Sequence, residues 1–89
     1  MPWVVLESAD CGMSWSRVDG TACHPSRSRA LLEAMVVVID DWDPAEDILD
    51  RISSELKRES EAYYWFKAIR IVEVPTPRYC RQPLRRVLR

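Results

Sequence analysis

The segment EAYYWFKAIRIVEV, residues 61–74, constrains the fold of this 89-residue chain more than any other. It is rich in aromatic and β-branched residues and is followed by Pro75 and Pro77, a pattern typical of a β-strand. Both faces of such a strand are largely apolar, so both need cover. We therefore expect a strand over 62–74 whose second face is covered by a partner, a second copy of the chain or the chain's own end.

Two further strands are expected near the N-terminus. Residues 2–7, PWVVLE, open with a proline and are apolar up to Glu7. Within residues 14–23, SWSRV (14–18) runs into Asp19-Gly20, a dipeptide that favours the positive φ angles of a tight hairpin turn, and 21–23 is the expected return strand before Pro25. With 62–74 these segments predict a mostly antiparallel, three-stranded sheet.

A helix is predicted over residues 44–59. Asp43 is a natural N-cap, Pro44 suits the first helical position, and Glu46 can reach back to the cap. The apolar residues of this segment recur at helical spacing and form one stripe: Ile48, Leu49, Ile52 and Leu56.

Residues 26–41 are ambiguous between helix and strand. Ser26 or Ser28 can cap a helix, and ALLEAM contains good helix formers. The β-branched run at 36–39 suits a buried strand instead. A helix over about 27–39 is favoured over a switch from helix to strand near Glu33. The fold class predicted is α+β, a two-layer domain over residues 1–77 with one or two helices on a single face of the sheet.

Charge is separated along the chain. The net charge is −1, but residues 1–77 hold fourteen acidic and eight basic side chains, whereas 78–89 hold five arginines and no acid. Six acids lie within residues 40–50, a window without a base. Such asymmetry indicates surfaces for charged partners. The basic tail comprises Arg78, Tyr79, Arg81, Arg85, Arg86 and Arg89.

The tail allows several interpretations. Its arginines can grip phosphates, which favours nucleic acid. Leu84, Val87 and Leu88 are interleaved with them, which favours docking on protein. The tail packing on its own acidic surface, or on that of a sister subunit, is the interpretation we favour, and a membrane is the least favoured.

Catalytic and metal-binding patterns are weak. Zinc accepts the ligand types of Cys11, Cys23, His24 and Cys80, but no C-x-x-C pair is present. A calcium loop counted from Asp41 would need glycine where Glu46 stands. We expect no catalytic residue, metal or cofactor. The longest apolar run, 34–39, is too short to span a membrane, and no signal segment is evident. A cytoplasmic protein with three free thiols is therefore expected.

These features predict a small non-enzymatic interaction protein, an adaptor or inhibitor of the bacterial, phage or mobile-element type. It would bind a larger protein, such as a nucleic-acid-binding one, and a homodimer is compatible with the pattern. The alternatives are a nucleic-acid-binding protein that uses the basic tail, and a small zinc- or magnesium-dependent protein. The predicted partner surface comprises Asp40, Asp41, Trp42, Asp43, Glu46, Asp47, Asp50, Tyr63 and Trp65.

Overall fold

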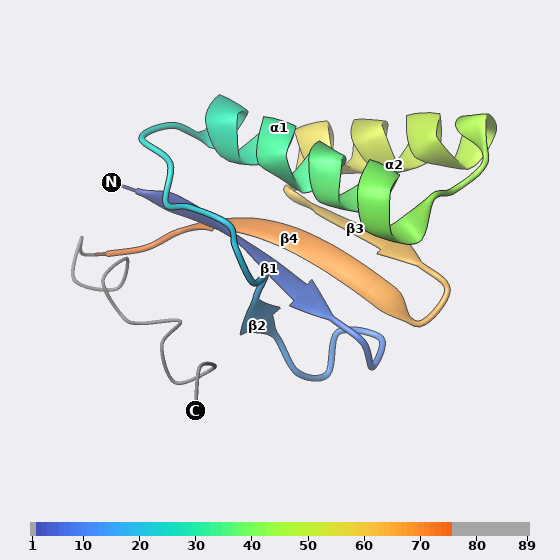
Figure 1. Cartoon of the computed structure of the whole chain (residues 1–89), viewed down its shortest axis with the longest axis horizontal. Helices are drawn as coiled ribbons and strands as arrows, with labels where there is room; N and C mark the ends of the chain where they lie inside the picture. The colour runs from blue at the N-terminus through green and yellow to red at the C-terminus, as the bar shows by residue number, and fades with distance from the viewer. Residues whose placement is uncertain (1, 76–89) are drawn as a thin grey trace.

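The protein is an open four-stranded antiparallel sheet with two helices on one face (Figure 1). The computed structural model describes residues 2–75, so the basic tail predicted at 78–89 lies outside the described residues. The strands are β1 (Trp3–Ser8), β2 (Ser16–Arg17), β3 (Glu61–Tyr64) and β4 (Lys67–Glu73), in the order β2-β1-β4-β3. The predicted two-layer α+β fold is confirmed, with four strands rather than three.

The additional strand arises because the segment predicted as one strand over 62–74 is a hairpin. The chain reverses at Trp65 and Phe66, and Tyr64 pairs with Lys67. Trp65 has a φ of 60°, a left-handed value that glycine usually supplies in tight turns. The sequence therefore lacks the usual turn signal. The reversal is favoured by burial, because it places Ala62 and Ile69 side by side in the core.

The segment predicted at 14–23 contains only the short strand β2, which lies before the turn. Only Ser16 and Arg17 pair with β1, and the Asp19-Gly20 turn follows, with Gly20 at a φ of 82°. Residues 21–23 do not form a return strand. The chain instead crosses toward the helices, and His24 exchanges two 2.8 Å backbone hydrogen bonds with Trp3.

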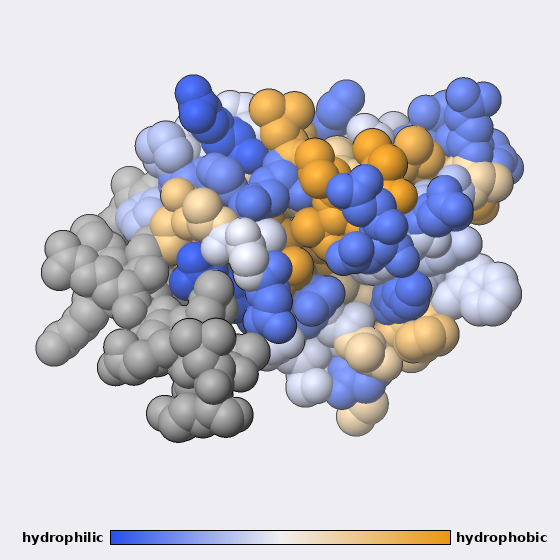
Figure 2. Space-filling view, in the orientation of Figure 1, coloured by the Kyte–Doolittle hydropathy of each residue, from blue (hydrophilic) through white to orange (hydrophobic). Residues whose placement is uncertain are grey.

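The helix predicted at about 27–39 is confirmed as α1 (Arg27–Val37), capped by the Ser26 side chain. One π-helical turn, η1 (Val38–Trp42), extends it, and Asp43 ends it in a left-handed conformation with a φ of 46°. The β-branched run is helical because Val37 and Val38 pack into the core from this helix. Leu31 and Met35 pack against the core, whereas Leu32, Val36 and Ile39 are exposed, and Figure 2 shows apolar surface over α1.

The second helix, α2 (Glu46–Glu59), begins two residues later than predicted. Ala45 is its N-cap and makes no side-chain cap hydrogen bond, so the predicted cap at Asp43 is wrong. Asp43 instead ends the π-helical turn: its backbone N–H donates to the Val38 carbonyl at 3.1 Å, and its left-handed φ of 46° differs from the extended conformation of an N-cap residue. The predicted apolar stripe is confirmed: Ile52 and Leu56 are buried, and Ile48 and Leu49 pack against the core.

The hydrophobic core lies between the helices and the sheet. Apolar contacts of this kind supply most of the stability of a small domain. On the opposite face of the sheet, the connection from β1 to β2 brings Trp15 over Arg70, with the guanidinium 4.0 Å from the ring centroid. Part of that second face is therefore covered from within the chain. The core residues are Val5, Val18, Ala30, Ala34, Val37, Val38, Ile52, Leu56, Ala62, Ile69 and Ile71.

The structure bears on two predictions from the sequence, the free thiols and the absence of a membrane-spanning segment. Cys11 is an exposed free thiol, but Cys23 is disulfide-bonded, so the expectation of free thiols is wrong for Cys23. Within residues 2–75, no helix has the length and apolar character needed to cross a membrane.

Candidate partner-binding site

Three segments that are distant in sequence line one hollow at the end of the molecule away from the N-terminus (Figure 1). They are η1, the turn between β3 and β4, and the connection between β1 and β2. Of the acidic residues predicted to bind a partner, Asp40 and Asp41 lie on η1, and the others follow at Asp43 and on the first turns of α2. The structure therefore adds the hairpin turn and the β1–β2 connection to their surroundings.

An aromatic cluster joins η1 to the hairpin. The Trp42 ring stacks on Tyr64 with centroids 5.9 Å apart, and Tyr64 contacts the Trp65 ring at 6.1 Å. Trp65 is 82% exposed and Phe66 is 50% exposed. We call Trp42, Tyr64, Trp65 and Phe66 the aromatic tip. Together with Lys67 these residues bound a shallow cavity of about 290 Å³.

Trp65 has a strained backbone conformation, with a φ of 60°. A bulky residue with positive φ is uncommon, and such strain costs on the order of 1–3 kcal/mol. Its exposure means that few core contacts offset this cost. Strained residues that project into solvent occur at functional sites more often than elsewhere, and Trp is a frequent anchor of protein interfaces. The hairpin turn is therefore a candidate contact point.

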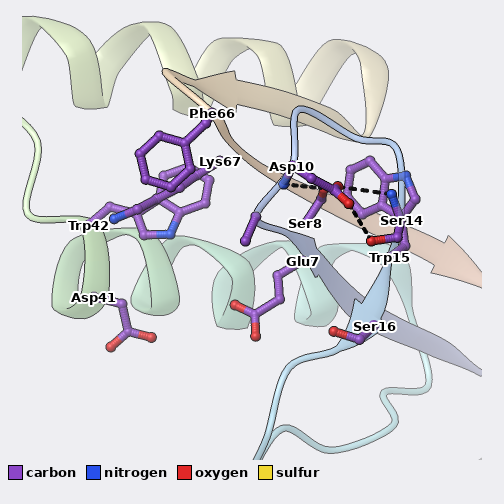
Figure 3. Close-up of a pocket in the computed structure, with 11 residues that line it drawn as sticks. Glu7, Ser8, Asp10, Ser14, Trp15, Ser16, Asp41, Trp42, Phe66 and Lys67 are labelled. Atoms are coloured by element: carbon purple, nitrogen blue, oxygen red, sulfur yellow. Dashed lines mark hydrogen bonds between the residues drawn. The ribbon is translucent and has the colours of Figure 1, made fainter.

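Lys67 lies beneath the aromatic tip. Its Nζ is 6.0 Å from the centroid of Trp42 and 5.9 Å from that of Phe66, and Figure 3 shows its side chain beside both rings. Cations are attracted to aromatic faces at such distances. The rings around Lys67 thus already accommodate a positive charge.

The acidic residues at 40–50, which we call the acidic segment, lie on η1, at Asp43 and on the first turns of α2, and Asp41 lines a hollow together with Trp42, Phe66 and Lys67. All six carboxylates are on exposed residues, and none forms an ion pair with another residue of 2–75. Asp40 and Asp41 also lie at the C-terminal end of a helix, where the dipole disfavours negative charge. The acidic segment is therefore a negative surface without internal compensation in the described part of the chain.

A hollow of about 470 Å³ separates the aromatic tip from the β1–β2 connection (Figure 3). Partial burial raises the pKa of Glu7 in this hollow, and the nearby Asp41 and Asp19 raise it further. A cation entering the hollow would relieve both effects, because it replaces lost hydration and opposes the repulsion. The lining residues are Glu7, Ser8, Ala9, Asp10, Ser14, Trp15, Ser16, Asp41, Trp42, Phe66 and Lys67.

Asp10 holds the far wall of the hollow in place. Its carboxylate accepts hydrogen bonds from the hydroxyls of Ser14 and Ser8, both at 2.6 Å, and from the Ser14 backbone N–H at 2.9 Å. These bonds, with the Ser14 hydroxyl foremost, lower the pKa of Asp10 to about 2. Trp15 donates its ring N–H to the Gly12 carbonyl at 3.0 Å. The wall is a hydrogen-bonded loop in which Asp10 stays ionised.

The structure separates one predicted site residue from the others. Tyr63 neighbours Tyr64 along β3, so its side chain points to the opposite face of the sheet, near Gly12. The remaining predicted residues lie on the acidic segment or the aromatic tip. Sequence reasoning missed Glu7, Tyr64, Phe66 and Lys67. Only recognition of a hairpin within YYWFK would have found the last three, and that stretch contains no Gly, Asn or Pro.

Of the residues considered as zinc ligands, Cys11 is an exposed free thiol, and the others are engaged elsewhere or lie outside the described residues. His24 contacts Glu33 through Nε2, Cys23 is disulfide-bonded, and Cys80 lies beyond residue 75. Within 2–75 no three His, Cys, Asp or Glu side chains gather in a way that could hold a metal ion.

Comparison of the chain with models of protein families, with curated proteins and with solved structures gives no match. The candidate site therefore rests on its own geometry and chemistry.

Proposed function

We propose that this protein is a small non-enzymatic interaction protein that binds a larger, basic protein through the acidic segment and the aromatic tip. The observation that carries the proposal is the stacking of Trp42 on Tyr64. This contact joins the carboxylates of η1 and α2 to the exposed rings of the hairpin. A surface of this kind combines long-range attraction with an apolar anchor.

The two parts of the surface have different roles in the proposal. The uncompensated carboxylates attract a basic partner and orient it before contact. Trp65 and Phe66 then bury apolar area in the complex, where aromatic side chains contribute most of the binding energy. An arginine or lysine of the partner enters the hollow between Glu7 and Asp41, and the Trp42 ring offers a cation–π contact.

The partner class that we propose is a nucleic-acid-binding protein of the adaptor's own cell or of its host. The acidic segment presents carboxylates in place of the phosphates that such a protein binds, so it would occupy the partner's basic channel. An adaptor or inhibitor of this type needs no chemistry of its own.

Two variants test the proposal with little disturbance of the fold. Trp65→Gly removes the anchor and relieves the positive φ, so the free energy of unfolding should not fall. The triple change of Asp40, Asp47 and Asp50 to Asn removes charge on the exposed acidic segment. Affinity capture from a lysate of the source cells, read by mass spectrometry, should show the specific partner reduced at least about tenfold with either variant.

Matched controls come from outside the surface. Tyr63→Ala removes an exposed ring on the other face of the sheet, and Glu59→Gln removes an exposed carboxylate at the far end of α2. Both control variants should retain the partner. If Trp65→Gly and the triple Asn variant recover the same proteins as the unchanged chain, the proposed function is wrong.

A cytoplasmic location remains part of the proposal, and Cys23 offers a way to test it. Stable disulfides are typical of oxidising compartments. Alkylation in intact cells should label Cys23 if the protein resides in a reducing cytoplasm, with Cys11 as the accessible reference thiol. Protection of Cys23 together with labelling of Cys11 would contradict that location.

A further inference from the structure

The outer side of α1 carries an apolar stripe that the fold does not use. Leu32 is 68% exposed, Val36 is 53% exposed and Ile39 is 48% exposed. Their spacing of four and three residues places them on one side of the helix, and Figure 2 shows apolar surface over α1. We call these three residues the α1 stripe. Contiguous exposed apolar surface of this kind marks interaction sites.

Opposite charges flank the α1 stripe. Arg29 lies one turn before Leu32, is exposed, and forms no ion pair with a residue of 2–75. Asp40 and Asp43 follow Ile39 and are likewise exposed and unpaired within that range. The intervening Glu33 is already engaged by His24. Along this exposed side, a positive charge at Arg29 is followed by the apolar α1 stripe and then by the negative charges of Asp40 and Asp43.

This order of charges is complementary to itself when reversed. We propose that a second copy of the chain docks on the α1 stripe, with the two α1 helices antiparallel about a two-fold axis near Val36. Leu32 of each copy then faces Ile39 of the other. At 1.5 Å per residue, Arg29 lies about 10 Å before Val36, and Asp40 and Asp43 lie four and seven residues after it, so each Arg29 comes opposite these carboxylates of the other copy.

A parallel pairing is disfavoured by the same charges. It would place Arg29 against Arg29 and Asp40 against Asp40, and like charges opposed in an interface disfavour that partner orientation. In the antiparallel dimer, Arg29 also supplies a cation to the C-terminal end of the other copy's helix, where Asp40 and Asp41 otherwise face the negative end of the dipole.

The dimer should be weak and sensitive to salt. Three apolar side chains per copy make a patch smaller than most specific interfaces bury, and the flanking ion pairs are exposed. The α1 stripe is distinct from the aromatic tip, although Asp40 and Asp43 contribute to both surfaces. Dimerisation does not depend on the proposed partner, and the two can be tested separately.

Sedimentation velocity of the full chain, from micromolar to millimolar concentration, tests the proposal. The average mass should rise from 10.4 kDa toward twice that value, and the transition should move to higher concentration in added salt. Val36→Glu should hold the protein monomeric throughout. Circular dichroism would verify that the variant remains folded, as expected for a substitution at an exposed position.

Charge reversal tests the antiparallel orientation. Arg29→Glu and Asp40→Arg should each raise the dimer dissociation constant about tenfold or more, and the double variant should restore it. Asp40 is preferred to Asp43 for this test because Asp43 holds a left-handed φ of 46° that arginine would strain. The control, Arg58→Glu, reverses an exposed charge on α2 and should leave the dissociation constant unchanged.

A protein that stays monomeric up to millimolar concentration overturns the proposal, whether the stripe is then covered by the chain's own C-terminal segment or by a different protein. Dimers that persist in Val36→Glu overturn it as well, and a double reversal without rescue overturns the antiparallel arrangement. Trp65→Gly should leave dimerisation unchanged. Loss of partner capture and loss of dimerisation are therefore distinguishable.

Discussion

The two helices pack on the same face of the sheet but present different surfaces to solvent. α2 directs its large apolar residues, Ile52 and Leu56, into the core and carries charged side chains elsewhere. α1 buries Ala30, Ala34 and Val37, while larger apolar side chains such as Leu32 remain exposed. The outer side of α2 carries charged side chains that water solvates. The outer side of α1 is unexplained by the fold alone, which is why we assign it to association.

The C-terminal ends of the two helices also differ in whether the chain itself stabilises them. At the end of α2, Arg27 donates hydrogen bonds to the Leu56 and Lys57 carbonyls at 3.0 and 2.7 Å, and to the Ser60 hydroxyl at 3.0 Å. These contacts satisfy carbonyls that a helix end leaves free. At the end of α1 the chain instead places Asp40 and Asp41. One end is stabilised internally, and the other is available for a basic group from outside.

The largest predicted difference concerns leucines on the two helices. Leu56→Ala should lower the free energy of unfolding by about 2–5 kcal/mol, because it opens a cavity at a fully buried position. Leu32→Ala should change it by less than about 0.5 kcal/mol. Urea denaturation at low protein concentration measures both without interference from self-association. If the two variants lost the same free energy of unfolding, α1 would be anchored through its outer side, contrary to the exposure of Leu32.

A smaller effect is expected at the helix end that is internally stabilised. Arg27→Ala should lower the free energy of unfolding by about 1.5–3 kcal/mol, since it removes charged donors from partly buried carbonyls. Arg27→Lys should recover only part, because an ammonium lacks the planar fork. The matched control is Arg29→Ala, which removes an exposed arginine two residues further along the same helix. It should leave the free energy of unfolding unchanged in dilute solution. Chemical denaturation distinguishes the three, and a neutral Arg27→Ala would contradict the capping role.

The smallest effects come from carboxylates at opposite helix ends. Asp41→Asn should raise the free energy of unfolding by about 0.3–1 kcal/mol, whereas Asp47→Asn in the first turn of α2 should lower it by a similar amount. Removing Asp41 also removes one cause of the raised Glu7 pKa. Denaturation at low and high salt is the measurement, because salt should shrink both changes. Changes of the same sign would show that the helix dipoles do not distinguish the two ends.

Local patterns predicted part of this structure well. The apolar stripe from Ile48 to Leu56 predicts α2, and Asp19-Gly20 predicts the turn that is observed. The start of α2 was misjudged because Asp43 has two competing roles. It can cap a helix in isolation, but in the folded chain it closes the π-helical turn. Such competition between neighbouring elements is not visible in a local pattern.

The candidate site was predicted only in part. The six carboxylates and Trp42 are evident from composition, and Trp65 from its aromatic surroundings. Tyr64, Phe66 and Lys67 join them because the chain reverses at Trp65, whereas Tyr63 is separated because successive side chains of β3 point to opposite faces of the sheet. Glu7 was overlooked since it lies more than thirty residues from Asp41 in sequence, and only the β1–β2 connection and η1 bring the two to one hollow.

The sequence by itself determined the α+β class, the amphipathic α2, the Asp19-Gly20 turn and the separation of charge, because each depends on periodicity or turn chemistry within a few residues. The tertiary structure decided the hairpin at Trp65 and Phe66, the side of α1 that faces the sheet, and the grouping of the aromatic side chains beside Asp41. These features depend on burial between distant segments, such as Ala62 against Ile69 and Val37 against the sheet. Burial of that kind can override local preference when it removes enough apolar surface from water.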